Sequence, residues 1–319
     1  MAKKVLAGAV LLVLAAVVFA AVALVRAHAG VRRERIPLPD AAALQAGAAE
    51  ADRPVRVSWI NTASQPMPRS GVLDPHLDPR PNAAYVMSHP AFVLEWADGR
   101  LLLVDTGMNR EQARAFGRPI EVLSGGKAIE PHGSTAEHLG EARSRVRGIV
   151  FTHLHSDHTG GILDLCAGRA GPLPVFMTEA AATRPNYTTR PGLDYVARSG
   201  CARVDRLPDG AALSVPGFPG VRVVAAGGHT PCSQIVVADV HGADGDRRYV
   251  FTGDVANNID GIEANVPKPF LYSMVIVPED GPRLYELRGY LHEMRERGAT
   301  LLVSHDQLQL EGSGIPVWR

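Results

Sequence analysis

The N-terminal part of the chain is continuously apolar. Val5–Val25 carries no charged or strongly polar side chain, and the short basic stretch Met1–Lys4 precedes it. As a helix, this run of 21 residues would be roughly 31 Å long, which is enough to cross the hydrocarbon core of a bilayer. The pattern predicts a transmembrane anchor or signal segment over residues 1–29 and a tether, rich in Ala and Arg, over residues 30–53.

Three interpretations of this segment compete. Ala27-His28-Ala29 matches the small-residue cleavage site of a secretory signal peptide. The apolar stretch, however, is longer than the usual ~7–15 residues of such a peptide. We therefore favour an uncleaved anchor over a cleaved signal, and both over a buried helix of a soluble protein.

The charges around the span leave its orientation open. Lys3 and Lys4 precede it, whereas arginines follow it at positions 26, 32, 33 and 35. The positive-inside tendency would keep the body of the protein in the cytoplasm, while a secretory-type start would export it. We expect a membrane protein with a single N-terminal span and its body on the exported side.

From residue 54 onward the pattern is that of short strands with helices between them. Ala91–Trp96 and Leu101–Val104 flank an Asp- and Gly-containing turn and predict a hairpin. Pro278–Arg297 places apolar residues on one face, as an amphipathic helix does, and Gln65–Pro90 has no clear periodicity and is expected to be a surface loop. A second short helix is predicted at Thr135–Ala142. Further strands are predicted at Val55–Ile60, Val146–Phe151, Leu173–Met177, Val221–Ala225, Gln234–Val240, Tyr249–Phe251 and Thr300–Val303.

Composition narrows the class of protein. The chain has 319 residues, 46% of them hydrophobic, which suffices for a substantial core. Its 33 Lys and Arg balance 33 Asp and Glu, so we expect no nucleic-acid partner, which would favour an excess of basic residues. Three cysteines without a CxxC pair exclude a disulfide scaffold and a Cys-rich zinc module. Whether Cys166 and Cys201 pair stays open, since an exported body would allow it.

The most informative stretch follows the predicted strand Val146–Phe151. His153, His155, Asp157 and His158 lie within six positions of one another. Two residues apart on an extended strand end, His153 and His155 point the same way, and the other two follow where the chain turns toward a helix. Imidazole and carboxylate groups are suitable ligands for zinc and other divalent transition metals.

Three further candidate ligands lie downstream. His229, Asp254 and His305 each follow an apolar predicted strand, beside small or turn-forming residues. Strands that share one sheet edge would bring these ends together. Five histidines and two carboxylates would then suffice for two adjacent metals. We expect the other histidines to have no such role; they are His28, His76, His89, His132, His138, His241 and His292.

In this order, the HxHxDH motif and the three later residues resemble the metallo-β-lactamase-fold hydrolase superfamily, and Leu103–Gly107 resembles the turn that precedes the motif there. The resemblance implies an αββα sandwich, an α/β (α+β) fold, over residues 54–319. It also implies a dinuclear metal site at one edge of the sandwich. Carried over by position, His153, His155 and His229 would hold one metal, and Asp157, His158 and His305 the other, with Asp254 bridging them. Asp105 would support the site without being a ligand.

Such a site implies metal-assisted hydrolysis. Two divalent ions, expected to be Zn²⁺ with Mn²⁺ or Fe²⁺ as alternatives, can share a water, lower its pKa and polarise a carbonyl group. Asp157 would orient the resulting hydroxide and pass a proton to the leaving group. No serine or cysteine nucleophile is needed.

The substrate is less constrained by the sequence. Asp at position 254, where a cysteine often contributes in the best-known β-lactamases, disfavours that activity. The apolar stretch Pro267–Val277, with Phe270 and Tyr272, is a candidate wall for an acyl chain. We expect hydrolysis of a lactone, ester or thioester in a small, partly apolar molecule. A β-lactamase-like or phosphodiester hydrolase, and a non-catalytic membrane-tethered metal-binding module, remain alternatives.

Overall fold

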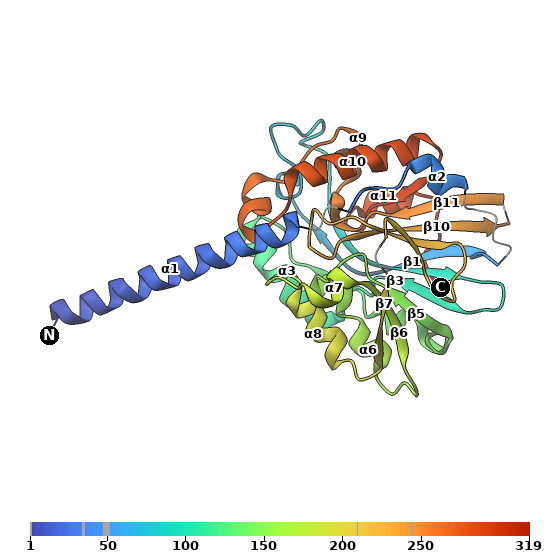
Figure 1. Cartoon of the computed structure of the whole chain (residues 1–319), viewed down its shortest axis with the longest axis horizontal. Coiled ribbons are helices and arrows are strands. Elements are labelled where there is room, and N and C mark those ends of the chain that lie inside the picture. Colours follow the sequence, from blue (N-terminus) through green and yellow to red (C-terminus); the bar gives the residue numbers. More distant parts are fainter. Residues whose placement is uncertain (1, 34–35, 47–51, 209, 244) are drawn as a thin grey trace.

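The computed structural model describes residues 2–33, 36–46, 52–208, 210–243 and 245–319. Its first helix, α1 (Ala2–Arg32), stands away from the rest of the chain (Figure 1). Gly8–Arg32 contains an 18-residue window with a mean hydropathy of 3.0 and is long and apolar enough to cross a membrane. No residue of that window is buried against the body, as expected for a span or a signal segment and not for a core helix.

Part of the predicted tether packs on the body. Residues 41–46 form the short helix α2 (Ala41–Ala46), and Ala41 and Leu44 are buried against α10 (Gly281–Glu296). Arg283 of α10 also donates a hydrogen bond to the carbonyl of Ile36, at 2.7 Å. Residues 34–35 and 47–51 of the predicted tether lie outside the described residues.

Two β-sheets form the centre of the described part of the chain. The first sheet has the strand order β4 (Glu130–Pro131), β1 (Arg56–Pro66), β2 (Val86–Glu95), β3 (Leu101–Val104), β5 (Val146–Val150), β6 (Leu173–Thr178) and β7 (Ala202–Leu207). The second has the order β12 (Thr300–Leu302), β11 (Gly245–Phe251), β10 (Gln234–Gly242), β9 (Val221–Ala225) and β8 (Ala212–Ser214). The predicted hairpin is confirmed, because β2 and β3 pair antiparallel.

Helices and short turns surround the sheets. The helices not yet given are α3 (Arg110–Leu123), α4 (Thr135–Leu139), α5 (Ser156–Thr159), α6 (Ile162–Cys166), α7 (Glu179–Thr183), α8 (Arg190–Arg198), α9 (Ile259–Glu263) and α11 (Gln307–Gly312). Single turns are η1 (Arg69–Gly71), η2 (Gly140–Arg145), η3 (Gly253–Val255) and the π-helical η4 (Tyr272–Ile276).

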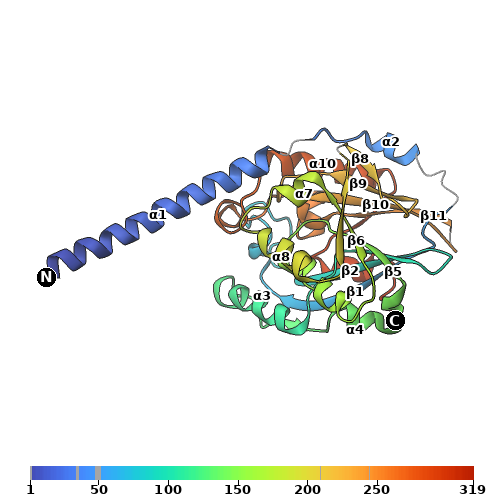
Figure 2. The ribbon, with the colours of Figure 1, turned by 60° about the horizontal axis from the view of Figure 1, so that its bottom comes forward.

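The elements stack as four layers, an αββα sandwich, as predicted (Figures 1 and 2). Successive strand residues point to opposite faces, and here both faces are buried. Val236 of β10 packs between the sheets, whereas its neighbours Ile235 and Val237 pack beneath α10. On the other side, the outer face of the first sheet is covered by α4, α6 and α8. Burial on both faces explains why these strands are almost continuously apolar.

Two departures from the expected pattern lie near the candidate site. Val86–Pro90 belongs to β2, although the sequence predicted a surface loop through Pro90; its polar residues Ser88 and His89 face the interior, where they find partners. The helix α3 was not predicted, since Gly117 and Pro119 interrupt its pattern. Its start is nevertheless well defined, because Asn109 and Gln112 form a reciprocal capping box.

The two cysteines left open above form a disulfide. Cys166 at the end of α6 is bonded to Cys201, which directly precedes β7. The bond fastens a covering helix to the edge strand of the first sheet.

Candidate metal centre

The pairing of the strands brings the predicted ligands to one end of the sandwich. β3 and β5 are parallel with Val104 opposite Val150, and β11 and β12 are parallel with Phe251 opposite Leu302. The residues that follow each pair therefore emerge side by side: Asp105 with the His153 segment, and Asp254 with His305. β9 runs antiparallel to β10, as β11 does, so His229 after β9 emerges at the same end.

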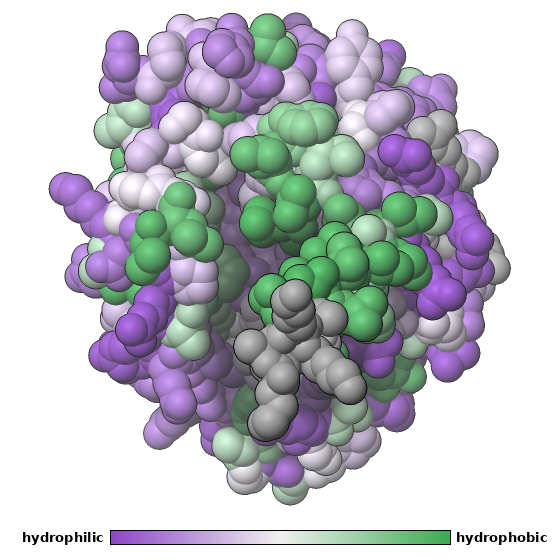
Figure 3. Space-filling model, turned by 90° about the vertical axis from the view of Figure 1, so that its left-hand side faces the viewer, coloured by the Kyte–Doolittle hydropathy of each residue, from purple (hydrophilic) through white to green (hydrophobic). Residues whose placement is uncertain are grey.

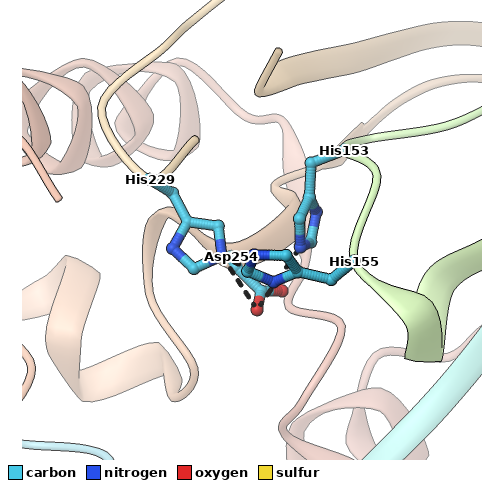
Figure 4. A group of neighbouring side chains, drawn as sticks. All are labelled: His153, His155, His229 and Asp254. Atoms are coloured by element: carbon cyan, nitrogen blue, oxygen red, sulfur yellow. Dashed lines mark hydrogen bonds and ion pairs between the residues drawn. The ribbon is translucent and has the colours of Figure 1, made fainter. Parts of the chain in front are cut away.

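Four side chains from three segments converge in a first group (Figure 4). It consists of His153, His155, His229 and Asp254, with one candidate ligand atom of each within 4.8 Å of the others. His229 Nε2 lies 3.3 Å from His155 Nδ1 and 3.5 Å from Asp254 Oδ2. The spacing fits a single cation between them, bound by three imidazoles and a carboxylate.

A second group adjoins the first through Asp254. His158 Nε2 lies 3.3 Å from Asp254 Oδ1 and also 3.3 Å from His305 Nε2. His305 Nε2 lies 3.1 Å from Asp254 Oδ2 and 3.5 Å from Asp157 Oδ2. All seven residues that the sequence singled out are thus brought together, and Asp254 is shared by both groups.

Asp105 supports this arrangement through contacts with Thr152 and His158. Its carboxylate accepts hydrogen bonds from the Thr152 backbone N–H at 2.7 Å and the Thr152 hydroxyl at 2.8 Å. It also lies 2.8 Å from His158 Nδ1, which leaves Nε2 of that ring facing the second group. Asp105 has a φ of +60°, an uncommon conformation that Asp tolerates better than most residues. The turn is packed closely, since a Cβ on Gly161 would stand 2.1 Å from the Thr106 carbonyl oxygen.

His89, for which no ligand role was expected, lies beside the candidate ligands. Its side chain is fully buried, and Nδ1 lies 3.1 Å from Asp157 Oδ2. With Asp157 and His305 it forms a third set of residues close enough to hold a metal. The available signal was the position of His89 two residues before the apolar run Ala91–Trp96, since the strand β2 extends back over it to Val86.

Lys268 and Glu279 are two further buried residues that the sequence did not indicate. Glu279 Oε1 accepts from His229 Nδ1 at 2.6 Å, so Nε2 of His229 is directed at the first group. Lys268 Nζ donates to Glu279 at 2.9 Å and to the Asp254 carbonyl at 2.7 Å. No local spacing marks either residue, because both reach the site only through tertiary packing.

The imidazoles of the first group are held neutral. Burial lowers the pKa of His155 to about 3, with the neighbouring His229 as the next cause. Burial likewise lowers the pKa of His153 well below its ordinary value, followed by the effect of His158, and it lowers that of His229, followed by the effect of Lys268. A neutral imidazole is the form that binds a metal.

The second group instead pairs carboxylates with histidines. Burial would raise the pKa of Asp157 and Asp254, but nearby imidazoles, led by His158 and His305 respectively, outweigh it and lower both. Burial would lower the pKa of His158 and His305, but Asp105 and Asp254 respectively lead the carboxylates that raise it. The negative charge that retains these protons would equally attract a divalent cation, whose binding releases protons.

Buried polar atoms without hydrogen-bond partners indicate whether the two groups suit a metal ion. His153 Nε2, His89 Nε2 and Asp254 Oδ1 are buried without a hydrogen-bond partner. Leaving such groups unpaired costs about 1–3 kcal/mol each. Two of the three belong to the first group, so the donor set fits divalent metal ions.

A cavity of about 420 Å³ opens above the two groups. Asp157, Asp254 and His305 lie in its lining, while Phe116 and Ile120 of α3 line an apolar wall. Tyr272, predicted to contact substrate, lines the cavity as well. Phe270, predicted with it, is 70% exposed and does not belong to the lining.

The sequence profile of the metallo-beta-lactamase superfamily matches residues 84–276, which is more than half of the chain. This range includes the motif His153–His158, His229 and Asp254, and it ends before His305. Among curated proteins, no sequence matches the chain.

Solved structures of low sequence identity share the fold. An N-acyl homoserine lactone hydrolase, with the product N-hexanoyl-L-homoserine bound at its catalytic metal centre, has 19% identity and a TM-score of 0.56, covering 82% of this chain and 98% of its own. A B. thuringiensis protein with N-decanoyl-L-homoserine at its active site has 19% identity and a TM-score of 0.55, with the same coverage. A probable metal-dependent hydrolase from Staphylococcus aureus has 13% identity and a TM-score of 0.55, covering 81% of this chain and 91% of its own. The chain belongs to the metallo-beta-lactamase superfamily and has the hydrolase fold of that family.

Proposed function

We propose that this protein is a hydrolase that binds two divalent cations and cleaves a lactone, ester or thioester bond in a small, partly apolar molecule. The observation that carries the proposal is the convergence of seven candidate ligand side chains, all buried except the half-buried His155, next to a cavity with apolar walls that four of them line. Structures with this fold include proteins that bind acyl-homoserine products, which supports a substrate with a carbonyl group and an acyl chain.

The ligands divide as the superfamily resemblance implies. His153, His155 and His229 would hold one cation and Asp157, His158 and His305 the other, with Asp254 between them. Zinc is the first expectation, since imidazole and carboxylate groups suit it. When bound, two such ions polarise a carbonyl group and lower the pKa of a water.

The protein's own groups would act around the reacting bond. Asp157 lines the cavity and is held ionised, so it can orient a nucleophilic water through a carboxylate oxygen. Tyr272 also lines the cavity, and burial raises the pKa of its phenol well above the ordinary value. It therefore stays protonated and can donate a hydrogen bond to a carbonyl or leaving-group oxygen. The apolar wall of α3 would exclude water and contact the acyl part.

We also propose that α1 anchors residues 54–319 to a membrane, with these residues on the exported side. The length and hydropathy of α1 support the anchor. The disulfide between Cys166 and Cys201 supports the exported side, because disulfides persist in oxidising compartments.

The proposal is tested with the full chain, depleted of metal and then given zinc, manganese or iron in turn. Each form is assayed against chromogenic lactones, esters, thioesters, β-lactams and phosphodiesters, while mass spectrometry counts the bound metal. We expect about two equivalents of metal and metal-dependent cleavage of a carboxylic ester-type bond. Two bound metals with no turnover of any substrate would favour the non-catalytic alternative, and cleavage of β-lactams or phosphodiesters alone would favour those activities.

The contact between Glu279 and His229 makes a separate prediction. Glu279→Gln keeps the shape but removes the charge that orients His229, so metal retention should weaken by about 10–100-fold. Competition with a chromogenic chelator measures this. Glu293→Gln is the matched control, because Glu293 is half exposed and paired with Arg297 on the surface. Equal metal retention in the two variants would mean that Glu279 does not position His229.

A further inference from the structure

The mouth of the active-site cavity is surrounded by exposed apolar side chains. They come from the end of α3 and from the segment that contains η4, and we call them the apolar rim: Val122, Leu123, Phe270, Leu271, Met274, Val275 and Ile276. All but Met274 are more than half exposed. Leu123 and Ile276 also line the cavity, so the rim continues into its wall. Figure 3 shows apolar residues gathered around a hollow on this face.

The base of α1 is attached to this rim. His28 Nε2 lies 3.0 Å from the Met274 carbonyl oxygen, and Ala27 and Val31 are buried where α1 meets the body. Tyr187 donates a hydrogen bond to the Val275 carbonyl at 3.1 Å. The views of Figures 1 and 2 agree that α1 leaves the body on the side where α3 lies. A bilayer crossed by α1 would therefore meet the rim directly.

Basic side chains lie between the apolar part of α1 and the body. Arg26 of α1 and Arg33, directly after α1, line a shared cavity of about 380 Å³ with Arg184 and Arg190 of the body. Arginines at the end of a span belong at the level of lipid headgroups, where they can contact phosphate groups. The headgroup level would therefore lie near residues 26–33, where α1 also contacts the rim through His28.

We propose that the apolar rim inserts into the bilayer that α1 spans, so that the active-site cavity opens toward the lipid. An exposed apolar patch at a membrane surface is stabilised by roughly 25 cal/mol per Å² of area removed from water. On a protein that remained in water, the same patch would be an aggregation hazard. The occupant is a lipid bilayer because each feature matches one of its layers. The basic cluster matches the headgroups, while the span and the adjoining apolar rim match the acyl chains.

The inference also narrows the substrate class, and in this part it rests on the proposed function. The rim residues Leu123 and Ile276 line the same cavity as His155, Asp254 and His305. A substrate could thus keep its acyl chain in contact with lipid and apolar wall while its carbonyl group reaches the metal ligands. This arrangement favours amphiphilic lactones or esters dissolved in the membrane over fully water-soluble ones.

Depth-dependent quenching tests the insertion without any need for activity. The full chain is reconstituted in phosphatidylcholine vesicles whose acyl chains carry bromine, a short-range quencher of tryptophan. Leu271→Trp places a reporter on the rim, while Val317→Trp places one at an exposed position near the C-terminus, far from α1 (Figure 1). The native Trp59, Trp96 and Trp318 are buried and contribute the same background to both. We expect the added emission to be mostly lost at position 271 and retained at position 317.

Retained emission at position 271 would overturn the inference, whether the rim is covered by water or by a second copy of the chain. Quenching at both positions would overturn it too, since the rim would then not be distinguished from the rest of the surface. Neither outcome depends on whether the protein is a hydrolase.

Turnover tests the substrate class. The double variant Leu271→Asp, Val275→Asp puts two charges on the rim outside the cavity lining. We expect on the order of a tenfold lower rate with a long-chain ester dissolved in vesicles and an unchanged rate with a short-chain soluble ester. Equal effects on both esters would reject the membrane route. Failure of the wild-type chain to hydrolyse either ester would count against the proposed function, and the quenching result would stand independently.

Discussion

Replacing Asp254 with alanine should lower kcat/KM by on the order of 10³-fold, about 4 kcal/mol of transition-state stabilisation. Asp254 is the residue that the two candidate ligand groups share, and its Oδ2 lies 3.1 Å from His305 Nε2 and 3.5 Å from His229 Nε2. Under the proposed assignment, its loss would remove a ligand from both cation positions at once. Mass spectrometry of the purified variant should find fewer metal ions than in the wild-type chain.

The control for this prediction is Asp246→Ala. Asp246 also lies near a histidine, His241, but its side chain is 59% exposed. It lies at the start of β11, whereas Asp254 follows the end of that strand. We expect this variant to retain wild-type activity and metal content. An Asp254→Ala variant that folds normally, by circular dichroism, and still turns over substrate at a rate similar to wild type would refute the assigned metal centre.

Replacing Arg69 with methionine should destabilise the fold by about 3–5 kcal/mol. The Arg69 side chain is 2% exposed and donates to Asp78 at 2.8 and 2.7 Å and to Asp260 at 2.7 Å. These bonds fasten the segment after η1 to α9, beside the residues that line the cavity. Without the guanidinium, buried Asp78 loses its main compensating charge, and Asp260 keeps only Arg80, which donates to it at 2.8 and 2.7 Å. Urea-induced unfolding of the metal-free chain measures the difference.

Arg203→Met is the matched control. Arg203 forms a similar two-pronged pair with Asp205, at 2.8 and 2.7 Å, but its side chain is 58% exposed. Exposed pairs contribute about 0–1 kcal/mol, so this variant should unfold almost as the wild type does. Similar losses in the two variants would mean that burial does not strengthen the Arg69 cluster.

The Arg69 cluster also predicts a dependence on pH. The hydrogen bond from Arg69 is the largest cause that lowers the pKa of Asp78 below its ordinary value of 3.8. A lowered folded-state pKa stabilises the fold fully above the unfolded pKa, and this contribution is lost as pH falls through the folded pKa. The gap in unfolding free energy between wild type and Arg69→Met should therefore be widest near neutral pH and shrink below about pH 4. A gap that is constant with pH would contradict this explanation.

Short-range sequence patterns predicted the elements whose burial is set locally. The run Val5–Val25 predicted a long apolar helix, and the alternation and apolar content of segments such as Gln234–Val240 predicted strands close to those observed. The HxHxDH motif could be recognised because its four candidate ligands lie within six residues of one another. The edge strand β7 escaped prediction, since only Leu207 of its six residues is buried and three of them carry charge.

Contacts between distant residues could not be predicted in the same way. His89 meets Asp157 across 68 positions of the chain, and Glu279 meets His229 across 50. The pairing of Cys166 with Cys201, and the packing of α2 on α10, likewise depend on which elements become neighbours. Sequence pattern reports which face of an element is apolar, but not which element will cover it.

The ligand types, their order and the apolar span were thus readable from the chain itself, because they depend on residue identity and on spacings of a few residues. The second layer of contacts around the ligands, the shape of the cavity and the position of the rim beside α1 required the folded chain. They arise from the register of parallel strands and the stacking of two sheets, which bring residues together regardless of their separation in sequence.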